Sequence, residues 1–207
     1  MLPYVVAMCV LVALVLWAIR TSRPWLEWIA KPLAALTFIA AALHQGALEA
    51  RWTSVLFGGL VLAAIGDVLL IPKSKKSFLA GLVAFLLGHV GYAIAFAVRG
   101  LHWPAAGMSG AVLVVAAIPI VRWLWPHVER PMRAPVIVYV IVITAMVALA
   151  VGTFARSPDA RLPIGAFCFY LSDLAVARHR FVKASFFNRA WGLPLYFGSQ
   201  LILAWSA

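Results

Sequence analysis

The amino-acid sequence predicts an all-α fold: a polytopic integral membrane helical bundle of about eight transmembrane helices, forming a single transmembrane domain over residues 1–207, with both termini on the non-cytoplasmic side. Three observations lead to this prediction. The chain is 65% hydrophobic, with a mean hydropathy of +1.02. Only 11% of its residues are charged, about half the fraction that is usual in soluble domains. The 17 Lys and Arg residues outnumber the six Asp and Glu residues, and they lie mostly between long apolar runs.

This composition excludes several classes of protein. A disordered chain, a soluble globular enzyme and a disulfide scaffold all need more charge, more polar residues or more cysteine. The net charge of +11 would suggest nucleic-acid binding in a soluble protein, but here the bases separate apolar runs, so we expect no nucleic acid. Cys9 and Cys168 lie within apolar runs and are expected to be buried hydrophobic residues.

Eight apolar runs are long enough to cross a bilayer as helices. Such a helix needs about 20 apolar residues, within a range of roughly 17 to 25. His44 and Gln45 interrupt the second run. No base or cleavage site precedes the end of the first run, so we expect it to be retained as a span. The predicted spans cover residues 3–19, 32–48, 53–71, 78–98, 105–124, 134–154, 162–177 and 188–205.

The basic residues predict the orientation, because cytoplasmic loops carry an excess of Lys and Arg. Thirteen bases fall in the connections after the first, third, fifth and seventh spans, against four in the other connections. The thirteen are Arg20, Arg23, Lys31, Lys73, Lys75, Lys76, Arg122, Arg130, Arg133, Arg178, Arg180, Lys183 and Arg189. These connections are expected in the cytoplasm, which suits the cytoplasmic membrane of a bacterium.

Two of the six acidic residues lie inside apolar spans. A carboxylate there costs several kcal/mol unless it faces a polar interior, so Asp67 and Asp173 are candidates for function. They lie about 9 and 7.5 Å inside the cytoplasmic ends of their spans, which places them at one level of the bundle. A desolvated pair of carboxyls provides a general acid and a general base together. The alternative is that each Asp only locks helices together by hydrogen bonding.

Further polar side chains lie on helix faces that can share a pocket with these carboxyls. Each, taken alone, is more typical of a hydrogen bond between helices than of catalysis. His89 lies about 16 Å into its span, which favours substrate contact over proton transfer. The candidate substrate-binding residues are His89, Tyr92, Tyr170, Asn188, Tyr196, Gln200 and Lys31. The five histidines are scattered, so we expect neither a metal nor another cofactor.

Several of these segments resemble the YhhN-like transmembrane lysoplasmalogenase family. The similarity is most specific at Gly66-Asp67, Gly88-His89 and Ser172-Asp173, and it extends to the Lys31-Pro32 pair and to YFGSQ at 196–200. The resemblance implies an eight-span integral membrane hydrolase. Its substrate would be a lysophospholipid of the bilayer, lysoplasmenyl-ethanolamine or -choline, whose vinyl ether bond is cleaved to a fatty aldehyde and a glycerophospho-base. The acidic pair of the family would correspond to Asp67 and Asp173.

Two other functions remain open from the residues alone. A proton- or ion-coupled transporter also uses buried carboxylates as a relay, although Pro119 and Pro194 are weak signs of broken helices. An intramembrane aspartyl protease also uses two aspartates in spans. Such enzymes carry Gly-x-Gly-Asp, whereas this chain has Ala64 where the first glycine would stand. The sequence does not predict the oligomeric state.

Overall fold

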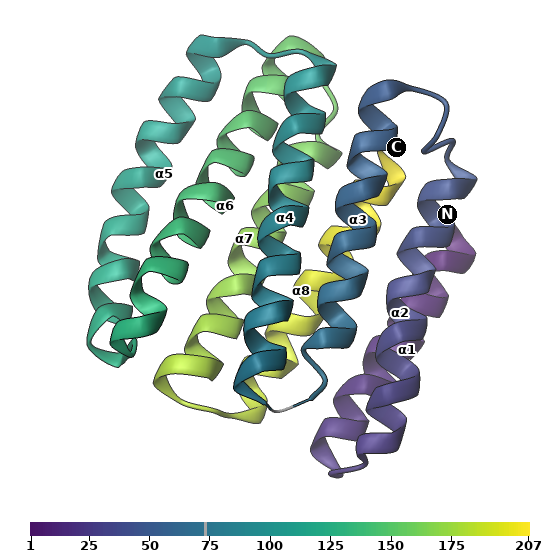
Figure 1. Ribbon diagram of the computed structural model, residues 1–207. Helices are drawn as coiled ribbons and strands as arrows, with labels where there is room; N and C mark the ends of the chain where they lie inside the picture. The colour runs from purple at the N-terminus through teal and green to yellow at the C-terminus, as the bar shows by residue number, and fades with distance from the viewer. Residues whose placement is uncertain (73) are drawn as a thin grey trace.

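The computed structural model describes residues 1–72 and 74–207, which fold into eight α-helices as the apolar runs predict. A 3₁₀ turn, η1 (Trp125–His127), extends the fifth helix, and a π-helical turn, η2 (Arg178–Val182), extends the seventh (Figure 1). The helices are α1 (Leu2–Arg20), α2 (Pro24–His44), α3 (Arg51–Leu69), α4 (Lys75–Arg99), α5 (Trp103–Leu124), α6 (Arg130–Arg156), α7 (Arg161–Ala177) and α8 (Phe186–Trp205).

The chain is a multi-pass membrane protein. Six helices, α1 to α6, are long and apolar enough to cross a membrane. The other two are less apolar or shorter: α7 has 17 residues, and α8 carries Asn188, Arg189 and Gln200. The surface of the bundle suits a hydrocarbon solvent, because large apolar side chains point outward along the helices. On α5, for example, Met108, Val112 and Val115 are about two-thirds exposed or more, at 72%, 68% and 66%.

The second helix differs from its predicted span. We expected it to cover residues 32–48 because Pro32 looks like a helix start, but α2 begins at Pro24 and ends at His44, with Pro32 in its interior. Pro24 occupies the first turn, where a backbone N–H has no partner within the helix, so the missing N–H of proline costs no hydrogen bond. Lys31 therefore lies inside a helix rather than in a connection, and Glu27 lies in its first turn. Lys73, another base counted for the orientation, lies outside the described residues.

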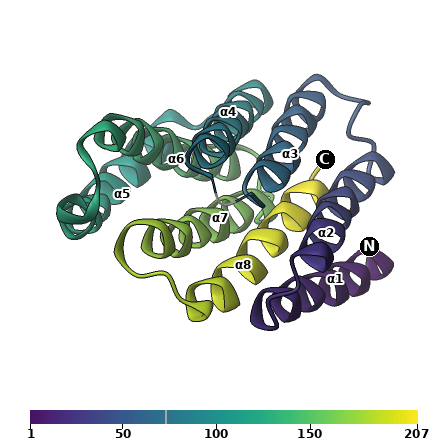
Figure 2. The same cartoon turned by 60° about the horizontal axis from the view of Figure 1, so that its bottom comes forward.

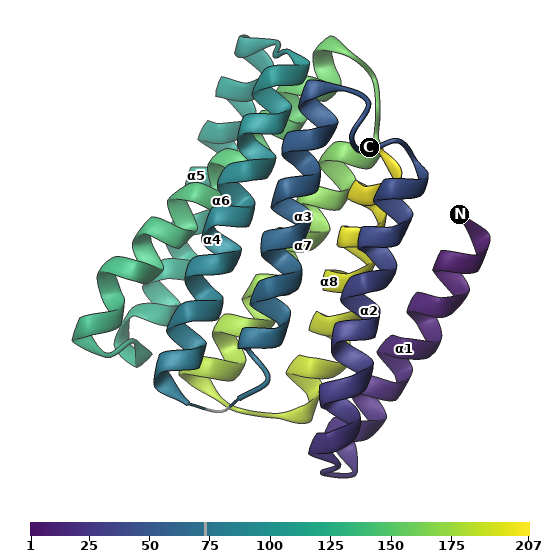
Figure 3. The same ribbon diagram turned by 45° about the vertical axis from the view of Figure 1, so that its right-hand side comes forward.

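Six helices form a closed ring, in which each packs against its two neighbours in the order α2, α3, α4, α6, α7 and α8. The two remaining helices lie outside this ring at opposite edges: α1 packs on α2 and α8, and α5 packs on α6 (Figure 2). Successive connections alternate between the two ends of the bundle, and both termini lie at the end that holds the α2–α3 connection (Figures 1 and 3). The side chains of six helices thus face one interior.

Small residues bring α3 and α4 close together. A Cβ atom on Gly59 would lie 2.5 Å from the Tyr92 ring and 3.0 Å from the carbonyl oxygen of Gly88. A Cβ atom on Gly91 would lie 3.2 Å from the Cα atom of Gly59. Close approach of this kind allows van der Waals packing to hold helices together inside a bilayer, where water gives no hydrophobic driving force. The fully buried Tyr92 is fixed against α3 by this contact.

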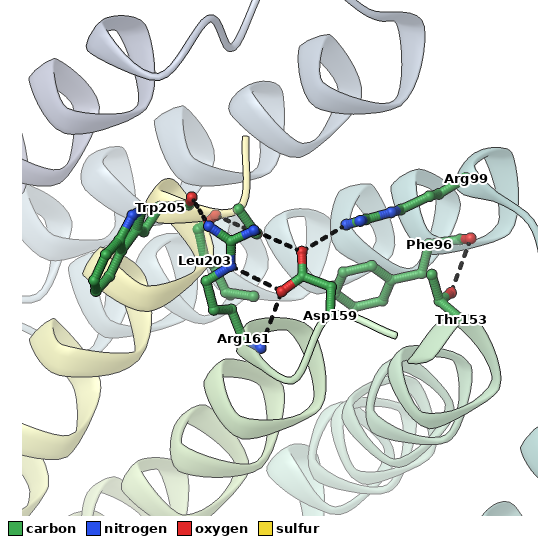
Figure 4. A network of polar contacts seen from close by, with 8 residues as sticks. Phe96, Arg99, Thr153, Asp159, Arg161, Leu203 and Trp205 are labelled. Carbon is green, nitrogen blue, oxygen red and sulfur yellow. Dashed lines mark hydrogen bonds and ion pairs between the residues drawn. The ribbon is translucent and has the colours of Figure 1, made fainter. Parts of the chain in front are cut away.

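At the end of the bundle that holds the α6–α7 connection, Asp159 joins three helices. Arg99 of α4 donates to Oδ2 of Asp159 at 3.1 Å, and Nε of Arg161 donates to Oδ1 at 2.8 Å. Arg161 also donates to the carbonyl oxygen of Trp205 in α8 at 2.7 Å (Figure 4). Burial alone would raise the pKa of Asp159, but the hydrogen bonds from Arg161 and Arg99 outweigh it and hold the pKa below its ordinary value.

Replacing Gly59 with Ala tests the close packing of α3 against α4. We expect Gly59→Ala to lower the free energy of unfolding by about 1–3 kcal/mol, because the added methyl group overpacks against Tyr92 and backbone. The matched control is Gly58→Ala, since a Cβ atom there meets nothing within 4 Å. Thermal unfolding in detergent measures both. Equal melting temperatures for the two variants would contradict the packing argument.

The Asp159 cluster predicts a pH dependence of stability. The pKa of Asp159 is lower in the folded state than in the unfolded state, where it is about 4. The stabilisation that Asp159 contributes is therefore present above the unfolded pKa, and it is lost as the pH falls through the folded pKa. We therefore expect Asp159→Asn to lower the melting temperature at pH 7 and to have less effect in strong acid. Glu129→Gln is the control, because its ion pair with Lys75 is exposed. An Asp159→Asn effect that does not change with pH would refute the prediction.

Candidate active site

The ring encloses a cavity of about 760 Å³, within the range of small-molecule and lipid sites. Residues from all eight helices line it. Ser22, Ser74 and Ala184, from the α1–α2, α3–α4 and α7–α8 connections, also line it, so the cavity reaches the end of the bundle where these connections lie. That end carries most of the Lys and Arg residues. A ligand of the headgroup region of a membrane can thus approach the interior.

Both span-borne carboxyls line this cavity. Asp67 lies in the last turn of α3, and Asp173 lies one turn before the end of α7. Their surroundings differ: the Asp67 side chain is 2% exposed and the Asp173 side chain 18% exposed. The two aspartates are therefore brought to one cavity but are not equivalent.

Asp67 is held by a buried cation and a phenol. Lys31 Nζ lies 3.3 Å from Oδ1 of Asp67 and donates to the backbone carbonyl oxygen of the same residue at 2.9 Å. Tyr196 donates to Oδ2 at 2.7 Å. Both oxygens of the carboxylate thus have a donor, and its charge is balanced by the ammonium group. A buried carboxylate with this set of partners is stabilised in its ionised form.

Asp173 is held by a phenol and an imidazole instead. Tyr139 donates to Oδ2 of Asp173 at 2.8 Å, and Nε2 of His89 lies 3.6 Å from the same oxygen. Among the ion pairs of the described residues, none joins Asp173 to a Lys or an Arg. This carboxyl therefore lacks the permanent counter-charge that Asp67 has.

The hydrogen bond at the other side of the His89 ring fixes where its proton lies. Nδ1 of His89 is 2.6 Å from the carbonyl oxygen of Phe85. A carbonyl oxygen can only accept, so Nδ1 carries the proton, and a neutral ring presents the lone pair of Nε2 to Asp173. A lone pair facing a carboxylate is unfavourable unless one proton lies on either group. Nε2 of His89 makes no hydrogen bond among the described residues, although it lies 3.6 Å from Oδ2 of Asp173. One proton on either group would let the two form a hydrogen bond beside the cavity.

Each helix of the ring contributes one polar side chain to these two clusters. The residues, in ring order from α2 to α8, are Lys31, Asp67, His89, Tyr139, Asp173 and Tyr196. Aromatic contacts separate and support them: between centroids, the ring of Phe169 lies 4.4 Å from His89 in a tilted contact and 5.3 Å from Tyr196 in an edge-to-face contact. One carboxylate with a buried counter-charge and one carboxyl without it thus face the same cavity.

The other predicted substrate-binding residues divide into two groups. Tyr170 and Asn188 line the cavity, but the amide of Asn188 is already bonded to Arg178 and to the carbonyl oxygen of Lys183. Tyr92 and Gln200 do not line it: they are fully buried, and the Tyr92 hydroxyl donates to Oε1 of Gln200 at 2.6 Å. His89 is likewise fully buried behind the lining residues.

Sequence reasoning missed Tyr139 and misplaced Lys31. Tyr139 lies in the predicted span 134–154, which has no charged residue to mark it as part of a site. A lone Tyr in an apolar span was the available signal. Lys31 was assigned to a connection because Pro32 looked like a helix start, whereas it lies inside α2 and is 2% exposed. Both residues donate to the aspartates that the sequence did identify.

Comparison with known proteins gives a consistent set of matches. The profile of the YhhN family matches residues 26–207. A lysoplasmalogenase of Mycobacterium bovis is 35% identical over 171 residues, which cover 79% of this chain and 62% of that protein. Lysoplasmalogenase TMEM86A of Bos taurus is 30% identical over 216 residues, covering 100% of this chain and 88% of the relative. Lysoplasmalogenase TMEM86B of Homo sapiens is 28% identical over 207 residues, covering 99% and 84%.

The chain thus spans 62% of the length of the mycobacterial relative but most of the length of the mammalian ones. The matched segment, 26–207, contains both aspartates and the four side chains that surround them. No solved structure matches the chain significantly.

Removing only the cation from the buried ion pair tests how Asp67 is held. We expect Lys31→Met to lower the free energy of unfolding by about 3–5 kcal/mol, because it leaves a carboxylate buried without its counter-charge. The double variant Lys31→Met with Asp67→Asn removes both charges and should recover most of that loss. Chemical or thermal unfolding in detergent provides the measurement. If the double variant is no more stable than Lys31→Met, the two charges are not coupled as the geometry requires.

Proposed function

The chain belongs to the YhhN family, and from this premise we propose that it is a lysoplasmalogenase: a membrane-embedded ether hydrolase that converts a lysoplasmalogen into a fatty aldehyde and a glycerophospho-base. The observation that carries the proposal is the pair of unlike carboxyls in one cavity, one ion-paired with Lys31 and one that accepts from Tyr139 and lies beside His89. Relatives that are named lysoplasmalogenase support the substrate class.

Asp173 acts as the general acid. A vinyl ether is hydrolysed when an acid protonates the alkene carbon remote from oxygen, which leaves a positive charge shared between the other alkene carbon and the ether oxygen. The proton comes from the Asp173 carboxyl, and the carboxylate that remains is the counter-charge of the oxocarbenium ion. His89 and Tyr139 are positioning residues, because they act through Asp173: Tyr139 donates to Oδ2 of its carboxyl, and Nε2 of His89 lies 3.6 Å from the same oxygen.

Asp67 acts on the water. Its ionised carboxylate orients a water molecule and takes a proton from it as the oxygen attacks the cationic carbon, which gives a hemiacetal. That proton then passes from Asp67 to the ether oxygen as the carbon–oxygen bond breaks, and the hemiacetal hydroxyl gives its own proton to Asp173. One water is consumed, an aldehyde and an alcohol are released, and both carboxyls return to their starting states. The scheme needs no metal or organic cofactor.

The remaining polar residues have supporting roles in this proposal. Tyr170, Tyr196 and Asn188 line the cavity and contact the substrate. Tyr92 and Gln200 act indirectly, because their mutual hydrogen bond holds α4 against α8 behind the aromatic layer. We also infer that all eight helices cross the cytoplasmic membrane of a bacterium, with the end that is rich in Lys and Arg in the cytoplasm and both termini outside.

The decisive experiment follows the proton into the product. Purified protein should release a fatty aldehyde from lysoplasmenyl-ethanolamine or -choline, and in D₂O that aldehyde should carry one deuterium on the carbon next to the carbonyl, detected by mass spectrometry after rapid trapping. We expect Asp173→Asn, and the charge-matched double variant Lys31→Met with Asp67→Asn, to lower kcat by about 10²- to 10⁴-fold, since each removes an acid–base group.

Two controls make this result specific. Glu129→Gln removes an exposed carboxylate outside the cavity and should keep full activity. A lysophospholipid with a saturated ether chain should not react, because it has no alkene carbon to protonate. Release of a fatty acid from an ester lysolipid without any aldehyde from the vinyl ether would refute the proposed reaction, and full activity of Asp173→Asn would refute the role of that residue.

A further inference from the structure

The lining of the cavity is divided between charged and apolar sides. Besides the two aspartates and Arg180 of η2, the charged side chains come from α2 and α8, where Arg23, next to the start of α2, Glu27, Lys31 and Arg189 line it. Apart from Tyr139, the side chains that α5 and α6 contribute are apolar. They are Ile120, Leu124, Val136, Val140 and Ile143. A ligand with a charged head and an apolar chain therefore fits the cavity in one direction only.

The charged residues of α2 follow one another along the helix from the mouth of the cavity to its interior. Arg23, Glu27 and Lys31 are spaced four residues apart, so they share one face of the helix and succeed one another at intervals of about 6 Å. Lys31 stands at the inner end, against Asp67. Glu27 and Arg23 stand nearer the mouth, and neither takes part in the ion pairs found among the described residues.

Arg189 faces the same mouth from α8. It lines the main cavity and also an adjoining recess of about 340 Å³, and His179 lines both spaces with it. Arg189 is partly buried, yet the ion pairs of the described part of the chain do not include it. The other arginines near the mouth are engaged otherwise: Arg178 donates to Asn188, Arg180 stacks on Phe78 at 4.2 Å, and Arg23 stacks on Trp17 at 4.5 Å. Arg189 is thus the guanidinium group left to bind a ligand anion.

We propose that the mouth of the cavity is a binding site for a zwitterionic phospholipid headgroup, in which Arg189, assisted by His179, binds the phosphate and Glu27 binds the ammonium group. A partly buried guanidinium suits the oxygens of a phosphate diester, and basic pockets between transmembrane helices are typical headgroup sites. The proposal rests on the function proposed above and specifies which end of the substrate lies where.

The headgroup position agrees with the chemistry of the two carboxyls. Arg189 precedes Tyr196 by seven residues, so it lies about 10.5 Å along α8 from the donor to Asp67. The glycerol part of the substrate and the arginine side chain together span that rise. Asp67 takes its partners from α2 and α8, on the charged side, whereas Asp173 takes its partners from α4 and α6, on the apolar side.

In a lysoplasmalogen the ether oxygen lies toward the headgroup, and the alkene carbon that takes the proton lies toward the chain. A headgroup at Arg189 and a chain along α5 and α6 therefore place the carbon toward Asp173 and the oxygen toward Asp67. This orientation matches the acid and water-activating roles that the hydrogen bonds of the two carboxyls indicate independently. Arg189 and Glu27 are in this way specificity-determining residues rather than catalytic ones.

The test compares substrates with and without the headgroup. Arg189→Gln is expected to lower kcat/KM for lysoplasmenyl-ethanolamine by roughly 10- to 100-fold, mostly through KM, because one charge-assisted hydrogen-bonding group is lost. A 1-alkenylglycerol, which has no phosphate, should be cleaved equally by wild type and variant. Arg189→Lys should recover part of the loss, and Glu27→Gln should remove the preference for a headgroup with an amine over a plain phosphate.

Arg130→Gln is the matched control, because Arg130 is exposed, lies at the same end of the bundle and does not line the cavity. Equal losses on both substrates, or no loss on either, would overturn the headgroup site while leaving the hydrolase proposal intact. If wild type cleaves no vinyl ether, the proposed function fails instead. The site is then judged by binding alone: a saturated-ether lysophosphoethanolamine should raise the melting temperature of wild type more than of Arg189→Gln, an alkylglycerol should not distinguish them, and any other pattern refutes the site.

Discussion

The ion pair between Lys31 and Asp67 is the constraint on which the interior depends. Two opposite charges inside a hydrocarbon-embedded bundle are tolerated only if they meet at close range and their other hydrogen-bonding capacity is met. Lys31 and Tyr196 meet that need from α2 and α8, while Asp67 itself belongs to α3. The pair therefore joins three helices of the ring and keeps a polar cavity next to their ends.

The second carboxyl differs from the first because it lacks a buried counter-charge. Asp173 forms no ion pair with a Lys or an Arg among the described residues; its carboxyl accepts a hydrogen bond from Tyr139 and lies 3.6 Å from Nε2 of His89. The same ring thus presents an ion-paired carboxylate and a carboxyl without a counter-charge to one cavity, which the proposed reaction uses as base and acid. An acid and a base of this kind are what the hydrolysis of a vinyl ether needs, and neither would persist if both aspartates had equal surroundings.

Much of the fold follows from local patterns. The eight apolar runs mark eight helices, and Asp67 and Asp173 stand out as the two carboxylates within them. Local patterns fail where a residue has two readings. A proline can begin a helix or lie within one, so the sequence around Pro32 predicts Lys31 in a connection, whereas it lies inside α2. Tyr139 is amphipathic and common at membrane depth, so nothing in its own span distinguishes it from a packing residue.

The sequence by itself determined the number of helices and singled out the two carboxylates inside them, because hydrocarbon penalises polar groups so strongly that such residues stand out in an apolar run. Only the tertiary structure decided which groups meet. The donors to the aspartates are separated from them by 34, 36 and 129 residues, for Tyr139, Lys31 and Tyr196. Such contacts depend on the order of the helices in the ring and on the rotation of each about its axis, which packing between helices sets and no local pattern records.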